Sequence, residues 1–192
     1  MEKLKVLVAE DHKATQKLYD RFLAEEIFDR NFAKSGEEAL DIYRTWKPEL
    51  IILDLMLPEV SGYTVLKEIR EDLGDKGIPI IISSKLASKD DILSCAKFGV
   101  QGYIGKPINW NEIGRRVLDC FQKAHPQMAD RVAELRKQLE AKIASKGMGK
   151  RKEKEPEKPK ETETKEAAEK PEETGKEKET EKPEEMEKEK VA

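Results

Sequence analysis

Three acidic side chains follow two strongly apolar segments of this sequence. Glu10 and Asp11 come directly after residues 4–9, and Asp54 comes directly after residues 50–53. Strands buried on both faces of a parallel sheet are apolar in this way, and open α/β sheets bind ligands at the carboxyl ends of their strands. Acids gathered at one such edge repel one another unless a cation intervenes. Mg²⁺ fits, because it binds one or two carboxylates and completes its octahedron with water and phosphate oxygens.

A hydroxyl and a lysine follow two further apolar segments. Ser84 ends residues 79–84, and Lys106 comes shortly after residues 102–104. A hydroxyl donor and an ammonium aimed at a carboxylate would together bind a phosphoryl group placed on that carboxylate. Carboxylates accept phosphoryl groups when a metal and a lysine offset the developing charge. The pattern therefore favours phosphoryl chemistry at Asp54, with the alternative that this acid only caps the next loop.

The elements that must position these residues alternate between strand and helix. Predicted strands cover residues 4–9, 30–33, 50–53, 79–84 and 102–104, and predicted helices cover residues 14–26, 36–46, 62–73, 88–98 and 109–123. Right-handed crossovers then place helices on both faces of a parallel sheet. The first and third strands are the most apolar, so they should be central neighbours, in the strand order 2-1-3-4-5. We expect an α/β fold, a flavodoxin-like doubly wound sheet of five parallel strands.

Helix starts are marked by polar residues at capping spacing. Ser35 with Glu38, and Asn109 with Glu112, have the spacing of a capping box, and Ser88 opens the fourth predicted helix. These residues set the expected starts of three helices.

Composition limits the classes of protein that the chain can belong to. Of 192 residues, 40% are charged and 37% apolar, so one core must come from a concentrated part of the sequence. A net charge of −3 offers no bulk attraction for nucleic acid or anionic lipid. The two cysteines, Cys95 and Cys120, have no CxxC spacing, which indicates neither a disulfide framework nor a zinc site. Without a signal-like start or a membrane-length apolar run, a cytoplasmic location is expected.

Residues 3–124 resemble the receiver domain of two-component response regulators, in a CheY-like, stand-alone form. The resemblance depends on the following residues in chain order: the pair Glu10-Asp11, the Asp-x-x-x-Pro-x-x-x-Gly motif of Asp54, Pro58 and Gly62, then Ser84, Tyr103 and Lys106-Pro107. The sequence departs from the usual pattern at three positions. Glu10 replaces the commoner Asp, Ser84 replaces the commoner Thr, and Lys85 stands where a small residue is usual.

The resemblance implies a role for each acidic residue of the site. Asp54 would accept a phosphoryl group from a histidine kinase or a phosphotransfer protein. Glu10 and Asp11 would bind Mg²⁺ together with Asp54 and the main-chain carbonyl of Met56.

The resemblance also implies how the signal would leave the site. Ser84 would hydrogen-bond the phosphoryl group and move toward it, and Tyr103 would rotate inward. Lys106 would pair with the phosphoaspartate, and the Lys106-Pro107 peptide would be cis. The surface of the fourth helix, fifth strand and fifth helix would then report the change to an unidentified downstream protein.

Two residues beside the predicted site have open or minor roles. Lys85 either restricts access to the pocket and alters the rate of dephosphorylation, or extends its ammonium into solvent. His12 follows the metal-binding acids, and we expect it to be exposed at a helix start rather than to act as a ligand or phosphodonor.

The expected domain organisation is a receiver domain over residues 1–124, a helical extension over 125–146 and a disordered Lys/Glu/Pro-rich tail over 147–192. Apolar residues of the extension recur every three or four positions: Met128, Val132, Leu135, Leu139 and Ile143. A stripe of about two heptads leaves a dimer contact and a helix lying on the domain both open, so a monomer or weak dimer is expected. The tail mixes both charge signs, so direct DNA binding is not expected. Membrane binding is not expected either, because of the net charge and the absence of a membrane-length apolar run.

Other functions fit the sequence less well. A pseudo-receiver, which would bind partners without phosphorylation, is the main alternative, but the complete acidic set and Lys106 argue against it. A haloacid-dehalogenase-type phosphatase needs a second acid two residues after Asp54, where Met56 stands. A DNA-binding regulator would need a DNA-binding region that we do not find.

Overall fold

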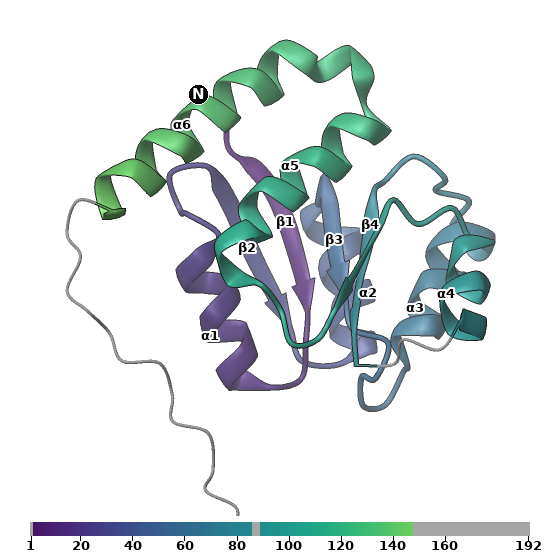
Figure 1. Cartoon of the computed structure of the whole chain (residues 1–192). Helices are drawn as coiled ribbons and strands as arrows, with labels where there is room; N and C mark the ends of the chain where they lie inside the picture. Colours follow the sequence, from purple (N-terminus) through teal and green to yellow (C-terminus); the bar gives the residue numbers. More distant parts are fainter. Residues whose placement is uncertain (1, 86–88, 148–192) are drawn as a thin grey trace, which may run out of the picture. The chain divides into compact units, whose positions relative to one another are not determined.

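Five parallel strands form one sheet in the part of the chain that the structure describes (Figure 1). The computed structural model describes residues 2–85 and 89–147. The strand order is β2-β1-β3-β4-β5, which confirms the predicted fold class. The strands are β1 (Leu4–Ala9), β2 (Phe28–Ala33), β3 (Leu50–Leu53), β4 (Ile80–Ser84) and β5 (Gly102–Gly105).

Helices cover both faces of the sheet (Figure 1). They are α1 (Lys13–Phe22), α2 (Gly36–Trp46), α3 (Gly62–Lys67), the π-helical turn η1 (Glu68–Asp72), α4 (Lys89–Ala96), the 3₁₀ turn η2 (Trp110–Glu112), α5 (Ile113–Ala124), the 3₁₀ turn η3 (Pro126–Met128) and α6 (Ala129–Gly147). One core cluster joins the sheet to α1, α5 and α6, and the other joins it to α2, α3 and α4. All residues of β3 and β4 are buried, as their continuous apolar sequences predicted.

The register of the central strands aligns the two acidic positions. Ala9 of β1 pairs with Leu53 of β3, and the Asp54 amide donates to the Ala9 carbonyl over 2.9 Å. Glu10 and Asp54 therefore leave adjacent strands at the same height. The edge strand β2 begins at Phe28, two residues before the predicted start, because this buried ring pairs with Leu4.

Three predicted helix boundaries were wrong. Helix α1 ends at Phe22 because the buried residues Leu23 and Ala24 turn the chain toward β2. The third helix changes into the π turn η1 and does not stay α-helical to residue 73. Asn109 makes no side-chain cap and precedes the 3₁₀ turn η2.

The other predicted caps have different outcomes. The hydroxyl of Ser35 accepts the Glu38 amide over 3.3 Å, as predicted. The Glu38 carboxylate accepts the amide of Lys34 rather than that of Ser35, so the capping box is incomplete. The predicted cap Ser88 and the segment 148–192 lie outside the described residues.

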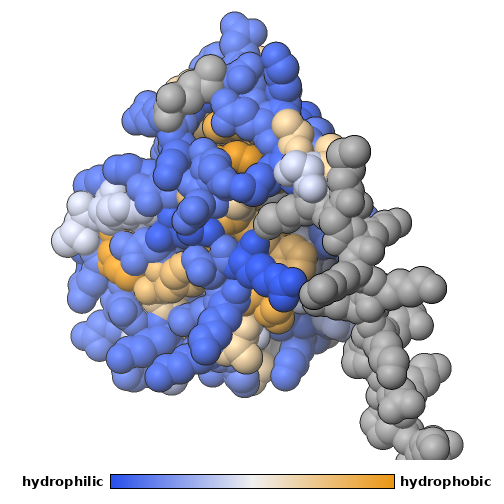
Figure 2. Space-filling view, turned by 90° about the vertical axis from the view of Figure 1, so that its left-hand side faces the viewer, coloured by the Kyte–Doolittle hydropathy of each residue, from blue (hydrophilic) through white to orange (hydrophobic). Residues whose placement is uncertain are grey.

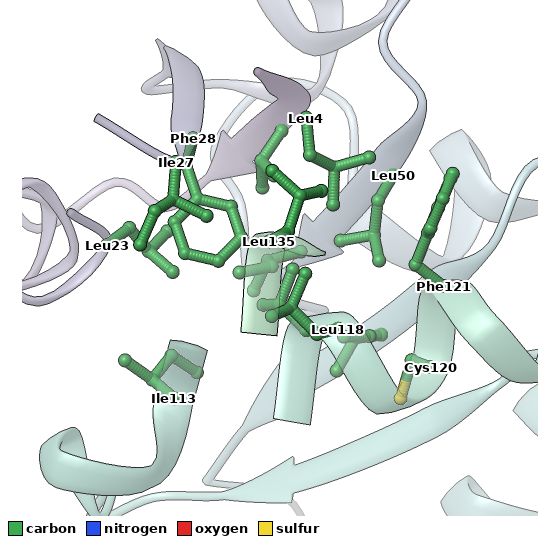
Figure 3. Packing of buried hydrophobic residues seen from close by; sticks show 14 of the residues in the cluster. Leu4, Leu23, Ile27, Phe28, Leu50, Ile113, Leu118, Cys120, Phe121 and Leu135 are labelled. Carbon is green, nitrogen blue, oxygen red and sulfur yellow. The ribbon is translucent and has the colours of Figure 1, made fainter. Parts of the chain in front are cut away.

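Helix α6 lies on its own domain and completes the first core cluster. Val132, Leu135 and Leu139 are at most 3% exposed, and Figure 3 shows Leu135 among core side chains that include Leu118 of α5 and Leu4 of β1. The opposite side of α6 is polar, and the surface on the side of α1 is mainly hydrophilic with apolar patches between (Figure 2). Of the two open alternatives for the stripe, the structure shows the helix lying on the domain. Within the described residues, no helix is long and apolar enough to cross a membrane.

Candidate functional site

The predicted site residues leave the carboxyl ends of four neighbouring strands. Glu10 follows β1, Asp54 follows β3, Ser84 ends β4 and Lys106 follows β5. Backbone hydrogen bonds join neighbouring ends, since the Asp54 amide donates to the Ala9 carbonyl and the Lys106 amide donates to the Ser84 carbonyl. The strand order thus brings together residues from positions 10 to 106.

Lys106 links the two buried carboxylates of the site. Its Nζ lies 2.6 Å from Glu10 Oε2 and 2.5 Å from Asp54 Oδ2. The side chain of Glu10 is 1% exposed, that of Asp54 is 7% exposed, and that of Lys106 is 12% exposed. The other Asp54 oxygen, Oδ1, accepts the Met56 amide over 3.0 Å. Both oxygens of Asp54 are therefore held in place by donors.

The electrostatics of this triad follow from its burial. Burial raises the pKa of the Glu10 carboxyl, and the Lys106 ammonium only partly offsets this effect. Burial would lower the pKa of Lys106, but its hydrogen bonds to Asp54 and Glu10 outweigh burial and raise that pKa. Lys106 therefore stays charged at neutral pH and neutralises part of the acidic site.

A cavity of about 260 Å³ opens beside the triad. Asp11, 32% exposed, and His12, 66% exposed, lie at its rim, and His12 Nδ1 lies 2.7 Å from Asp11 Oδ1. The lining residues are Glu10, Asp11, His12, Thr15, Asp54, Met56, Lys85 and Lys106. His12 is exposed at the start of α1, as expected, and Lys85 is exposed.

The donor set of this cavity suits a hard divalent cation. Three carboxylates, those of Glu10, Asp11 and Asp54, face one small space and supply only oxygen ligands. The Lys106 ammonium lies between two of them and offsets part of their mutual repulsion, which a divalent cation would reduce further. The residues present therefore fit Mg²⁺.

Ser84 and Tyr103 lie outside the lining of this cavity. Ser84 is fully buried at the end of β4, and Tyr103 is half-buried against the second core cluster. They belong to neighbouring strands, where Ser84 pairs with Gly105 and Tyr103 pairs with Ile82. Ser84 therefore ends the strand next to the acidic cavity, whereas Tyr103 lies two residues before that level of the sheet and lines a separate pocket with Arg116 of α5. The Lys106–Pro107 peptide bond is cis, as the resemblance implied.

Residues of α1 support the site from behind, and the sequence reasoning missed them. The Tyr19 hydroxyl donates to Ser83 Oγ over 2.8 Å, and Gln16 Nε2 donates to the Glu10 carbonyl over 2.6 Å. Burial raises the pKa of Tyr19, so its hydroxyl remains a donor. Trp110 packs edge-on against the Tyr19 ring. A polar residue at the one fully buried position of α1 would have been the sequence signal, but only the fold shows what it contacts.

Comparison with known proteins agrees with this geometry. Residues 6–118, more than half of the chain, match the response regulator receiver domain. The chain belongs to the response regulator receiver family. Receiver domains are signalling proteins rather than classical enzymes, and phosphorylation and Mg²⁺ binding are general features of the family.

Individual relatives cover the same region of this receiver-family chain. The polar-differentiation response regulator DivK of Brucella abortus is 36% identical over 104 residues, which are 54% of this chain and 85% of DivK. The probable transcriptional regulator ycf27 of Porphyridium aerugineum is 33% identical over 123 residues, or 64% of this chain, which spans only 50% of that relative. Among solved structures, a chain of the CheX–CheY–BeF₃–Mg²⁺ complex from Borrelia burgdorferi has a TM-score of 0.57 and 28% identity, covering 62% of this chain and 89% of its own.

Proposed function

We propose that Asp54 accepts a phosphoryl group from the phosphohistidine of a histidine kinase or phosphotransfer protein. One observation supports this function above the others: Lys106 Nζ lies between the buried carboxylates of Asp54 and Glu10, with Asp11 at the rim of the same cavity. A structural ion pair needs one carboxylate, whereas a phosphoryl acceptor needs a carboxylate, a cation and further acids for a metal. In this proposal the receiver domain of residues 1–124 does this in the cytoplasm.

The transfer step follows from the positions of the donors. An Asp54 carboxylate oxygen forms a new P–O bond while the P–N bond of the donor phosphohistidine breaks, and the released imidazole nitrogen takes up a proton. The Met56 amide and the Lys106 ammonium hold the Asp54 carboxylate in one orientation before the reaction. As negative charge builds on the phosphoryl oxygens, Lys106 can pair with them in place of one carboxylate.

Glu10, Asp11, Asp54 and the main-chain carbonyl of Met56 would hold Mg²⁺. When bound, the ion neutralises the charge of the phosphoryl oxygens and of the acids around them. Because burial raises the pKa of Glu10, such an ion would also favour the ionised form of this side chain.

The output surface in this proposal comprises α4, β5 and α5. Ser84 would move its hydroxyl toward the phosphoryl group, and Tyr103 would rotate inward beside it. Ile92 and Leu93 of α4 are 37% and 60% exposed, which gives a downstream protein apolar side chains to contact. The CheX–CheY–BeF₃–Mg²⁺ complex is a precedent for a receiver that binds another protein while it carries a phosphoryl mimic. Amide exchange that slows in α4 and β5 on addition of beryllofluoride and Mg²⁺ would support this surface, and exchange changed only in α6 would contradict it.

Phosphoryl incorporation from acetyl phosphate tests the acceptor directly. We expect Mg²⁺-dependent, alkali-labile labelling of the wild-type protein and of Asp72→Asn, which changes an exposed acid on η1. Asp54→Asn should take up no label, because the amide nitrogen is not a nucleophile for this transfer. Equal labelling of Asp54→Asn would place the acceptor elsewhere. A wild-type protein that takes up no label would favour the pseudo-receiver alternative.

A further inference from the structure

His12 lines the acidic cavity, yet phosphoryl transfer to Asp54 gives it no role. Its backbone is extended as the N-cap residue of α1, and its side chain makes no capping hydrogen bond. Instead, Nδ1 is hydrogen-bonded to Asp11 Oδ1 over 2.7 Å and lies 3.6 Å from Glu10 Oε1; a metal ion bound by both residues would take the place of this hydrogen bond. One ligand atom from each of these three residues lies within 4.8 Å of the others.

These separations fit donors that share one ion. Two ligands at neighbouring corners of an octahedron, with bonds of about 2.1 Å, lie about 3 Å from each other. The imidazole and the Asp11 carboxylate are already this close. Glu10 presents Oε2 to Lys106 and Oε1 to His12, so a cation on the Oε1 side leaves the Lys106 contact intact.

The nitrogen ligand changes which metal the site prefers. Mg²⁺ binds oxygen and gains little from an imidazole, whereas Co²⁺, Ni²⁺ and Zn²⁺ bind imidazole nitrogen well. With His12 beside Glu10 and Asp11, the site offers a nitrogen ligand in addition to its oxygen ligands.

We propose that His12 is a metal ligand that shifts the preference of this receiver site from Mg²⁺ toward divalent first-row transition ions. The inference builds on the proposed function, because it concerns the cation that assists phosphoryl transfer to Asp54. The imidazole would bind through Nδ1, beside Asp11 and Glu10. The pocket would then bind either class of ion, and the concentrations of Mg²⁺ and of the transition ions would determine which one occupies it.

The test compares Co²⁺ and Mg²⁺ binding by calorimetry and follows Co²⁺ by proton NMR. The chain contains two histidines, His12 and His125, so His125→Gln is a matched control far along the chain, where His125 packs against Phe121. In wild type and His125→Gln, Co²⁺ should give a paramagnetically shifted imidazole N–H signal. His12→Gln should lose that signal and about tenfold or more in Co²⁺ affinity, while its Mg²⁺ affinity changes less than twofold.

Two results would overturn the inference. One is a shifted imidazole signal that persists in His12→Gln or never appears in the wild type. The other is an equal loss of Mg²⁺ and Co²⁺ affinity in His12→Gln, which would mean that the side chain only shapes the pocket. In both cases Mg²⁺-dependent labelling of Asp54 would remain, whereas failure of the proposed function would abolish labelling and leave the Co²⁺ signals intact. Equal free energies of unfolding for His12→Gln and the wild type would show that the fold is unchanged.

Discussion

At the scale of residues, Glu10 is the least ordinary group of the site. This carboxylate, directly after strand β1, has 1% of its surface exposed, and Lys106, 96 residues later, is its main cationic partner. Burial raises its pKa from the usual 4.5 despite that partner. In the absence of metal, the ionised Glu10 carboxylate therefore lowers the stability of the folded state. This is typical of a residue in a binding site rather than of a stabilising ion pair.

This raised pKa predicts how stability depends on pH in metal-free buffer. The folded state keeps the Glu10 proton to higher pH than the unfolded chain does. Protonated Glu10 therefore increases the free energy of unfolding below about pH 4.5, and this contribution is lost as pH rises through the folded-state pKa. Glu10→Gln removes this titration. In urea unfolding with EDTA present, its stability relative to the wild type should therefore rise as pH increases from about 4.5 through the folded-state pKa of Glu10.

Glu37→Gln is the matched control, because Glu37 is exposed in the first turn of α2. Its stability relative to the wild type should show no comparable rise over the same range. A Glu10→Gln difference that stays constant or falls with pH would show that the Lys106 contact, and not burial, governs this carboxyl.

At the scale of elements, the π turn η1 directs a buried arginine at three backbone carbonyls. Arg70 is 5% exposed, and its Nε, Nη1 and Nη2 donate to the carbonyls of Phe98, Asp75 and Ile78 over 2.9, 2.7 and 2.7 Å. Phe98 closes the turn after α4, so this one side chain joins η1, the entry to β4 and the carboxyl end of α4. A π turn widens the helix by one residue, which explains how an α-helical pattern failed to predict an inward arginine.

Arg70→Met should lower the free energy of unfolding by about 3 kcal/mol, because one buried and two partly buried carbonyls lose their donors at about 1 kcal/mol each. Lys67→Met is the control on the preceding turn. Lys67 is 55% exposed and makes a long ion pair, 3.8 Å, with Glu71, so this substitution should lower the free energy of unfolding by about 0.5 kcal/mol or less. Urea unfolding of both variants measures the difference. Equal costs would mean that water replaces the guanidinium without penalty.

Helix α6 is held by core packing with ion pairs at its edges. Leu135 is 1% exposed, whereas Ile143 near the end of the helix is 36% exposed. Leu135→Ala should therefore lower the free energy of unfolding, measured in urea, by about 2–4 kcal/mol. The control, Ile143→Ala, should lower it by about 1 kcal/mol or less. If Leu135→Ala lowered the free energy of unfolding no more than Ile143→Ala did, the packing of α6 would not contribute to the stability of the core.

At the scale of the whole molecule, the sequence predicted the strand order and the residues that meet at the sheet edge. Apolar runs ending at Glu10, Asp54 and Ser84 specify which strands are buried and where their polar ends lie. Parallel topology then brings these ends together, whatever their separation along the chain. This reasoning needs no knowledge of side-chain packing.

What the sequence could not show depends on contacts between distant elements. Helix α6 approaches α5 closely because Gly114 has no side chain, and a Cβ there would lie 3.1 Å from Leu139. The Tyr19–Ser83 hydrogen bond and the position of His12 against Asp11 likewise depend on how α1 is placed on the sheet. Periodicity marks which residues are inside, but it does not identify their partners.

The most direct test of the central claim is a crystal structure of the protein with beryllofluoride and Mg²⁺. We predict that beryllium binds a carboxylate oxygen of Asp54, with Lys106 Nζ and Ser84 Oγ each within hydrogen-bonding distance of a fluoride and Mg²⁺ on Asp11 and Asp54. The account would be contradicted if beryllofluoride bound elsewhere, or if Asp54 stayed unmodified with Lys106 still between the two carboxylates at saturating concentrations.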